Sequence, residues 1–424
     1  MRRLCLSCCM LVATFASAQT LDECRTMARN HYPEIRKYGL IDQAEQYNLS
    51  NAAKAWLPQV TFSGQATYQS ATPTYPQAFS KMMQANGIDM SGIEKDQYKV
   101  AVDVSQNIWD GGQYKANKAI AEAEAAEQRS RTDVSLYALQ SRVDNLYFGI
   151  LLLDERVVQT KSLIAVLESN LGRLRSYLKN GVAMQADVDA VEAELLTARQ
   201  TLRQIETSRQ SYRRMLEAFI GKPLSADKLE RPVMQNVGSR TVARPELQHF
   251  DAQSKTLDAR RRAVNASVMP RFSAFAQGYY GYPGLDMFKS MTKTDLTLNG
   301  IVGVRMSWNV GALYTKKNNL DKLATAQNQI AVQRDVFLFN TSMLTMQEDG
   351  EVERLSMAVE DDAKIVELRR RVRLAAESQL KNGVIDATDL LRKIADETTA
   401  VQNQSTHEIE LLQTVYRLKT TLNQ

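Results

Sequence analysis

The chain has 424 residues, of which 44% are hydrophobic and 24% are charged, and its formal net charge is +5 at pH 7. Without the two arginines of the N-terminal segment described next, this charge falls from +5 to +3, so the chain is close to balanced. Since no basic block is interleaved with aromatic residues, the composition does not indicate a nucleic-acid partner.

The N-terminus has the order of a secretory signal peptide. Arg2 and Arg3 precede an apolar run from Leu4 to Phe15, and Ala16-Ser17-Ala18 then offers a small-residue cleavage site. The apolar run is shorter than the roughly 20 residues that a membrane helix needs. We therefore expect residues 1–18 to be a signal peptide that is removed on export.

The cysteines agree with export. A lipoprotein would be acylated on Cys8 or Cys9, but too little apolar sequence precedes them, so we favour cleavage without lipidation. The mature chain keeps only Cys24, and one thiol cannot form a disulfide within the chain. Packing must therefore stabilise the fold.

The mature sequence has no apolar run of membrane-helix length. The longest candidate, Phe148–Leu153, is followed directly by the charged residues Asp154, Glu155 and Arg156. If the chain crosses a membrane, it must do so with strands that close into a barrel, because open sheet edges are not tolerated in lipid.

Two long tracts have a helical composition. Gln113–Lys179 and Leu313–Lys381 contain no proline and are rich in Ala, Glu, Gln, Arg and Leu. A helix of about 67 residues is on the order of 100 Å long. Helices of this length predict a coiled coil or a helical barrel.

Both tracts end in the tetrapeptide Lys-Asn-Gly-Val, and an acid follows at the same distance. Asn-Gly after helix-forming residues predicts a C-cap with the glycine in the left-handed region, followed by a returning helix. These turns could be ordinary helical hairpin turns, but their duplication favours a shared role. The tip residues are Asn180, Gly181, Val182, Asn382, Gly383 and Val384, and the acids are Asp187 and Asp389.

Four segments of alternating polarity predict strands. Pro58 and Pro270 each mark the point where a predicted helix ends and a strand begins, because the residue before a proline is disfavoured in a helix. The alternation of apolar and polar residues is that of a transmembrane β-barrel with a wet lumen, although a half-buried sheet in a soluble domain also shows it. The predicted strands span residues 60–69, 98–105, 272–280 and 296–308.

Trp109 and Trp308 each stand at the end of a predicted strand beside a glycine turn. They suit an aromatic girdle at a membrane interface, or equally an anchor in a buried core.

Four strands cannot close a barrel, whereas three copies would supply twelve. The predicted fold is mainly α with transmembrane β: a trimeric 12-stranded barrel continued into a long periplasmic α-helical barrel, with an internal duplication. We expect residues 19–424 to form one protomer of two repeats, about 19–220 and 244–424, joined by a linker at 221–243.

This layout resembles the TolC family of outer-membrane efflux and secretion channels. The resemblance rests on Trp-Leu-Pro-Gln-Val at 56–60, Ser-Gln-Asn-Ile-Trp-Asp-Gly-Gly at 105–112, Arg-Pro-Glu-Leu at 244–247 and the two Asn-Gly-Val tips. It covers nearly the whole mature chain. It implies a homotrimer in outer-membrane lipid whose periplasmic tips meet an adaptor protein and an inner-membrane pump of the RND, ABC or MFS type.

The resemblance also implies a constriction near the tips. Asp389 matches a position where the family often carries an acidic ring, and Asp187 is its counterpart in the first half. One turn after Asp389 many members carry a second acid, whereas this chain has Arg392, which puts a cation-selective constriction in doubt. Arg392 and Asp389 could instead form a local ion pair.

No catalytic constellation is visible. His31, His249 and His407 are scattered, without cysteines or carboxylates at metal-ligand spacing, so we expect no enzyme activity, no metal and no cofactor. The rival to a channel is a soluble periplasmic coiled-coil scaffold or adaptor without a pore. An adaptor, however, needs a compact all-β module beside its hairpin, and the sequence predicts none.

Overall fold

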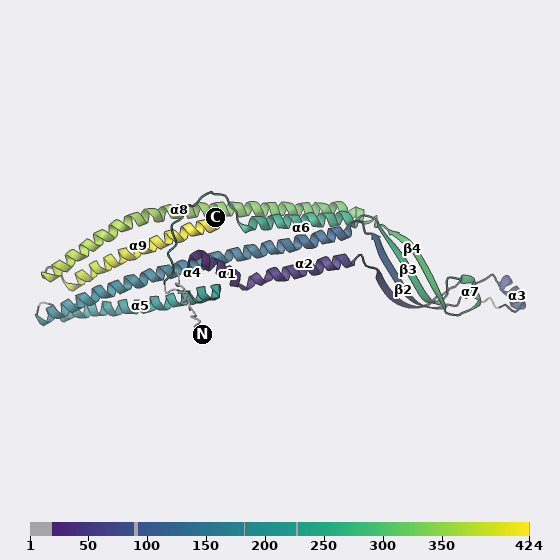
Figure 1. Ribbon diagram of the computed structural model, residues 1–424, viewed down its shortest axis with the longest axis horizontal. Coiled ribbons are helices and arrows are strands. Elements are labelled where there is room, and N and C mark those ends of the chain that lie inside the picture. The colour runs from purple at the N-terminus through teal and green to yellow at the C-terminus, as the bar shows by residue number, and fades with distance from the viewer. Residues whose placement is uncertain (1–18, 89–91, 182, 226–227, 424) are drawn as a thin grey trace, which may run out of the picture. The chain divides into compact units, whose positions relative to one another are not determined.

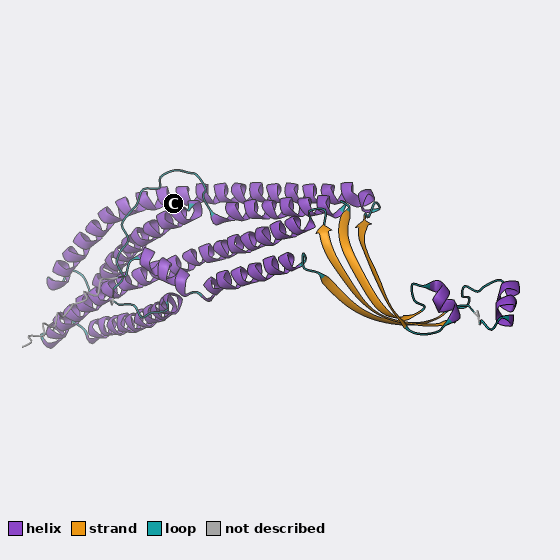
Figure 2. Cartoon of the chain, turned by 45° about the vertical axis from the view of Figure 1, so that its right-hand side comes forward, coloured by secondary structure: helices purple, strands orange, loops and turns teal. Residues whose placement is uncertain are grey.

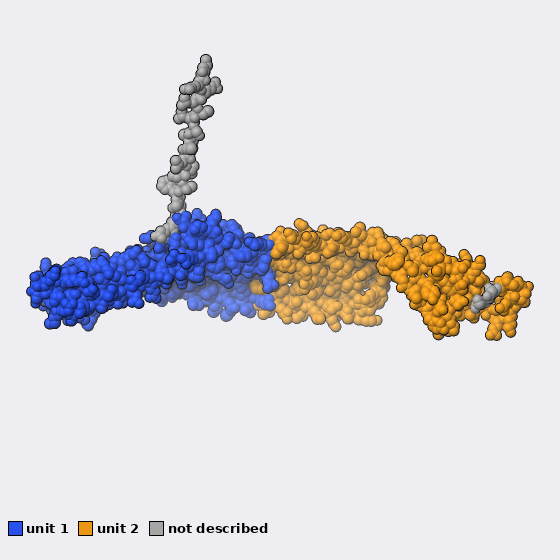
Figure 3. All heavy atoms as spheres, turned by 90° about the horizontal axis from the view of Figure 1, so that it is seen from below, with its two compact units in different colours: residues 1–38, 130–249, 333–424 blue, residues 39–129, 250–332 orange. Residues whose placement is uncertain are grey.

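The computed structural model describes residues 19–88, 92–181, 183–225 and 228–423, so the predicted signal peptide lies outside the described residues. The chain divides into two compact units, coloured blue and orange in Figure 3. Unit 1 consists of the chain up to Tyr38 together with residues 130–249 and 333–424, and unit 2 consists of residues 39–129 and 250–332. Each unit draws on both predicted repeats.

The helices dominate the chain and are labelled in Figure 1. None of those in the described residues combines the length and the apolar character that crossing a membrane requires. A 3-10 turn at Pro33–Arg36 separates the first two helices. The helices are α1 (Leu21–His31), α2 (Lys37–Lys54), α3 (Gln77–Ala85), α4 (Gln113–Lys179), α5 (Gln185–Ile220), α6 (Pro245–Ser267), α7 (Met287–Thr292), α8 (Ala312–Lys381) and α9 (Ala387–Leu422).

The two long helices end where the sequence predicts. Helix α4 has 67 residues and α8 has 70, and each stops at the lysine that precedes Asn-Gly. Helices α2 and α6 end shortly before Pro58 and Pro270, since the residue before a proline is driven out of the helical region.

Unit 1 contains two helical hairpins, α4 with α5 and α8 with α9. Leucines of α4 pack against Val188, Val191 and Leu195 of α5 in one apolar cluster. Leu355 of α8 packs against Leu411 and Val415 of α9 in another. A third cluster joins α1 to α4, α5 and α9, and it contains the fully buried Cys24.

Unit 2 contains a sheet of four antiparallel strands in the order β1-β2-β3-β4, drawn in orange in Figure 2. The two outer connections, from β1 to β2 and from β3 to β4, contain the short helices α3 and α7. The strands are β1 (Gln59–Tyr68), β2 (Asp96–Trp109), β3 (Arg271–Tyr282) and β4 (Thr297–Ser307).

Candidate functional site

The first hairpin tip is a tight turn between α4 and α5. Gly181 has a φ of 72°, in the left-handed region that disfavours residues with a Cβ, and its N–H donates to the Leu178 carbonyl at 3.0 Å. The Asn180 N–H donates to the Ser176 carbonyl at 3.2 Å. Asn180 and Gly181 are exposed, and Val182 lies outside the described residues.

The second tip repeats this geometry. Gly383 has a φ of 69°, and its N–H donates to the Leu380 carbonyl at 3.0 Å. The Val384 N–H reaches back to the Gln379 carbonyl at 2.9 Å, which completes the two-bond cap of the helix end. Val384 remains 69% exposed, so the turn presents an apolar side chain to its surroundings.

Apolar packing holds the two tips together within unit 1. Ala387, the first residue of α9, is 1% exposed and belongs to the cluster formed by α4 and α5. Leu380 and Leu391 pack against the same cluster. The structure therefore brings the two predicted tips to one end of unit 1, on a packed helical stalk.

The two predicted constriction acids differ in their local contacts. The Asp187 carboxylate accepts the Met184 N–H at 2.9 Å and so caps the start of α5. At α9 the cap is supplied by Asp386, whose carboxylate accepts the Asp389 N–H at 2.8 Å. The Asp389 carboxylate therefore does not cap α9. Within the described contacts it forms no ion pair with Arg392, which is exposed.

Trp109 and Trp308 lie at the helix-strand boundary of unit 2. A register shift between Asn107 and Trp109 pairs Trp109 with Phe272, and their ring centroids are 5.9 Å apart. The Trp308 indole N–H donates to the Val268 carbonyl at 3.0 Å. Both rings are partly exposed, and the indole N–H of Trp308 has a hydrogen-bond partner. Tryptophans at a membrane interface combine an apolar ring with a hydrogen-bonded N–H in this way. The girdle remains a prediction.

The strand register places most of the apolar residues of the four strands on one face. Val102 of β2 lies between Phe62 of β1 and Gly278 of β3, and Ala276 pairs with Val302 of β4. These side chains are not covered within the chain: Phe62 is 74% exposed and Val302 is 81% exposed. An exposed apolar face of this extent marks a site of contact with lipid or with another protein.

The opposite face of the sheet is polar. The Lys99 ammonium donates to the Gln277 side-chain oxygen at 3.1 Å and lies 4.4 Å from the centre of the Tyr279 ring. The Gln277 amide in turn donates to Asp103. The Arg305 guanidinium lies 4.7 Å from the centre of the Phe275 ring. These contacts join strands that are far apart in sequence. They become visible only once the pairing of the strands is known.

The comparisons with known proteins agree with these features. Residues 25–222 match the family described as Outer membrane efflux protein. Among curated proteins, no match to the chain is found.

Solved structures extend the similarity to nearly the whole chain. The outer-membrane channel OprN is 13% identical with a TM-score of 0.70, and the alignment covers 95% of this chain and 89% of that chain. The outer membrane channel MtrE of Neisseria gonorrhoeae is 16% identical with a TM-score of 0.68, covering 95% and 88%. The outer membrane channel CmeC of Campylobacter jejuni is 10% identical with a TM-score of 0.66, covering 96% and 86%. At such identities the similarity shows the fold.

The resemblance to TolC-family channels is therefore confirmed, as is the fold class of long helices continued from a four-stranded sheet. The matched family and the similar channels named above are described as outer-membrane proteins. In the described residues, no group of three or more His, Cys, Asp or Glu side chains is placed to hold a metal ion.

Proposed function

We propose that three copies of this chain form a passive exit channel in the outer membrane, as part of a tripartite efflux or type I secretion system. The observation that carries the proposal is the sheet: four strands in register, with one uncovered apolar face and one polar face. Lipid against the first face and water against the second would satisfy both.

Closure of the sheet requires other copies. Strands β1 and β4 are the edges of a four-stranded sheet, and their unpaired backbone groups cannot remain open in lipid. Three copies give twelve strands, enough for a closed barrel with a polar lumen, because barrel diameter grows with strand number. The Lys99–Gln277–Asp103 network would then line that lumen.

Helix α8 supplies a second reason for association. In unit 1 it carries a stripe of exposed apolar side chains at helical spacing, which a soluble single chain would leave in water. We propose that neighbouring protomers cover this stripe in the helical barrel. Its members are Val336, Phe339, Met343, Met346, Met357, Ile365, Leu368 and Val372.

The hairpin tips would then be the contact with a periplasmic adaptor. Their exposed residues, Asn180, Gly181, Asn382, Gly383 and Val384, stand on a packed stalk, which suits a rigid docking surface. An inner-membrane pump of the RND, ABC or MFS type would deliver substrate through that adaptor. Asp389 and Arg392 would lie near the periplasmic constriction.

The mass of the purified protein in detergent tests the assembly. A trimer that requires detergent supports the channel, whereas a monomer that stays soluble without detergent would support the rival scaffold. Phe339→Glu in the α8 stripe is expected to shift the trimer toward monomer, because it places a charge in the proposed interface. Ser342→Glu, which adds the same charge to the same helix outside the stripe, should leave the trimer intact.

A further inference from the structure

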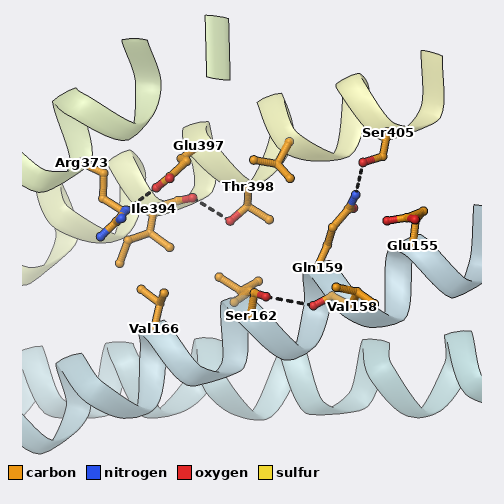
Figure 4. Close-up of a pocket in the computed structure, with 12 residues that line it drawn as sticks. Glu155, Val158, Gln159, Ser162, Val166, Arg373, Ile394, Glu397, Thr398 and Ser405 are labelled. Atoms are coloured by element: carbon orange, nitrogen blue, oxygen red, sulfur yellow. Dashed lines mark hydrogen bonds and ion pairs between the residues drawn. The ribbon is translucent and has the colours of Figure 1, made fainter. Parts of the chain in front are cut away.

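A pocket of about 330 Å³ lies in unit 1 between α4 and the α8–α9 hairpin (Figure 4). Glu155 and Gln159 reach it from α4, Arg373 from α8, and Ile394 and Ser405 from α9. Its volume is at the lower end of the range of about 300 to 1,000 Å³ that small-molecule sites occupy.

Gln159 leaves an unused hydrogen-bond acceptor in this pocket. Its side-chain N–H donates to the Ser405 hydroxyl at 2.5 Å, and the residue is only 9% exposed. Its side-chain oxygen is buried and has no hydrogen-bond partner. Because a buried polar atom without a partner destabilises the fold, this oxygen indicates a missing donor.

Glu155 adds a negative charge next to that acceptor. It lies one helical turn before Gln159, so both side chains are on the same side of α4 and line the same pocket. Among the described residues that line the pocket, the only cation is Arg373. It is already bonded to the carboxylates of Glu377 and Glu397, and its side chain is 13% exposed. The pocket therefore has an excess of negative charge.

The remaining lining is largely apolar, with Val158 and Val166 of α4 facing Ile394 and Val401 of α9. An apolar wall with one carboxylate and one free amide oxygen matches a compact apolar molecule that carries a protonated amine. We propose that this pocket binds small amphipathic ammonium compounds. The ammonium donates to the Gln159 oxygen and the Glu155 carboxylate, and the hydrocarbon body fills the space between the valines and Ile394.

Such a ligand would connect the two helical hairpins, because its charged end is held by α4 and its body by α9. The inference does not rest on the proposed channel function. Binding can be measured whether or not the protein conducts ions, and a failed channel would leave the pocket intact.

Isothermal titration calorimetry with 1-adamantylamine tests the proposal on the mature protein in lipid nanodiscs without free detergent. Glu155→Gln and Gln159→Leu should each weaken binding about tenfold, since a charged hydrogen bond or the free acceptor is lost. Glu194→Gln, which removes an exposed carboxylate of α5 outside the pocket, should bind as the unmodified protein does.

Adamantane-1-carboxylate, of the same shape and opposite charge, should not bind. The proposal is overturned if the unmodified protein does not bind the amine, if the carboxylate binds equally well, or if the two pocket variants bind as Glu194→Gln does. Glu155→Gln preserves the shape of the side chain, and helical content measured by circular dichroism confirms that each variant is folded.

Discussion

Arg25 and Asp144 form a two-bond ion pair that joins α1 to α4. The guanidinium donates from Nε to Oδ1 and from Nη2 to Oδ2, each at 2.7 Å. The two side chains are 17% and 8% exposed, and α1 packs beside them through Leu21, Cys24 and Ala28. Helix α1 is thus held by a largely buried charge pair as well as by apolar contacts.

Breaking this pair from one side should destabilise the protein. Asp144→Asn leaves the largely buried Arg25 charge with only the exposed carboxylate of Asp22, at 3.2 Å, as its partner. We therefore expect a loss of about 3 kcal/mol in the free energy of unfolding, measured by urea titration. The double variant Arg25→Met, Asp144→Leu should recover most of that loss, because no charge is left buried. As a control, Glu206→Gln breaks the exposed pair with Lys161 and should cost less than about 1 kcal/mol.

The acids beside the tips should respond differently to removal. Asp187→Ala removes the acceptor of the Met184 N–H and should cost about 1 kcal/mol at the start of α5. Asp389→Ala leaves the Asp386 cap of α9 in place and should cost little. Amide hydrogen exchange resolves the two helix starts. Equal loss of protection at both would show that the cap assignment is wrong.

Buried Glu348 predicts a pH dependence of stability. Burial raises the pKa of Glu348 above the ordinary value of 4.5, so the folded state binds its proton more tightly than the unfolded state. The stabilisation that Glu348 gives the folded state is therefore complete below its pKa in the unfolded state. It is lost as the pH rises through its pKa in the folded state. The unmodified protein should therefore lose stability as the pH rises above 4.5, and Glu348→Gln should lose less. The unfolding midpoint, measured across the pH range, shows the difference.

Glu351 is the matched control on the same helix. A hydrogen bond from Arg354 lowers the pKa of Glu351, so its contribution is present above the unfolded pKa and is lost as the pH falls. Glu351→Gln should change the pH profile in the opposite direction to Glu348→Gln. If the two variants shift the profile in the same direction, burial is not the cause for Glu348.

Two adjacent residues of β4 test the assignment of the sheet faces. Val302 lies on the uncovered apolar face, and its neighbour Ile301 pairs with Gln277 on the polar face. Val302→Arg should cost about 2 to 4 kcal/mol if that face meets the middle of the bilayer, and should lower the yield of assembled protein in the outer membrane. Ile301→Arg should assemble normally. Equal effects would contradict a lipid-facing and a lumen-facing side.

Short-range signals explain how much of this fold the sequence predicts. The ends of α4 and α8 follow from Asn-Gly, and the strand faces follow from alternation, since each depends on neighbouring residues. The bulge that turns Trp109 toward Phe272 has no comparable signal. Nor does the short helix α7 inside an outer connection.

Contacts between residues far apart in the sequence could not be predicted from local patterns. Arg25 and Asp144 are 119 positions apart, and Gln159 and Ser405 are 246 positions apart. Their meeting depends on how the hairpins pack, which composition and periodicity do not specify. The sequence predicts the hairpin tips because a repeated tetrapeptide marks them. No sequence motif marks the pocket between α4 and α9.

Single-channel conductance in planar bilayers tests the central claim most directly. The purified protein should give discrete current steps as a trimer, small and mostly closed, and Asp389→Ala should enlarge them without unfolding the helices. A protein that carries no current and remains a soluble monomer without detergent would contradict the channel and leave the scaffold as the better account.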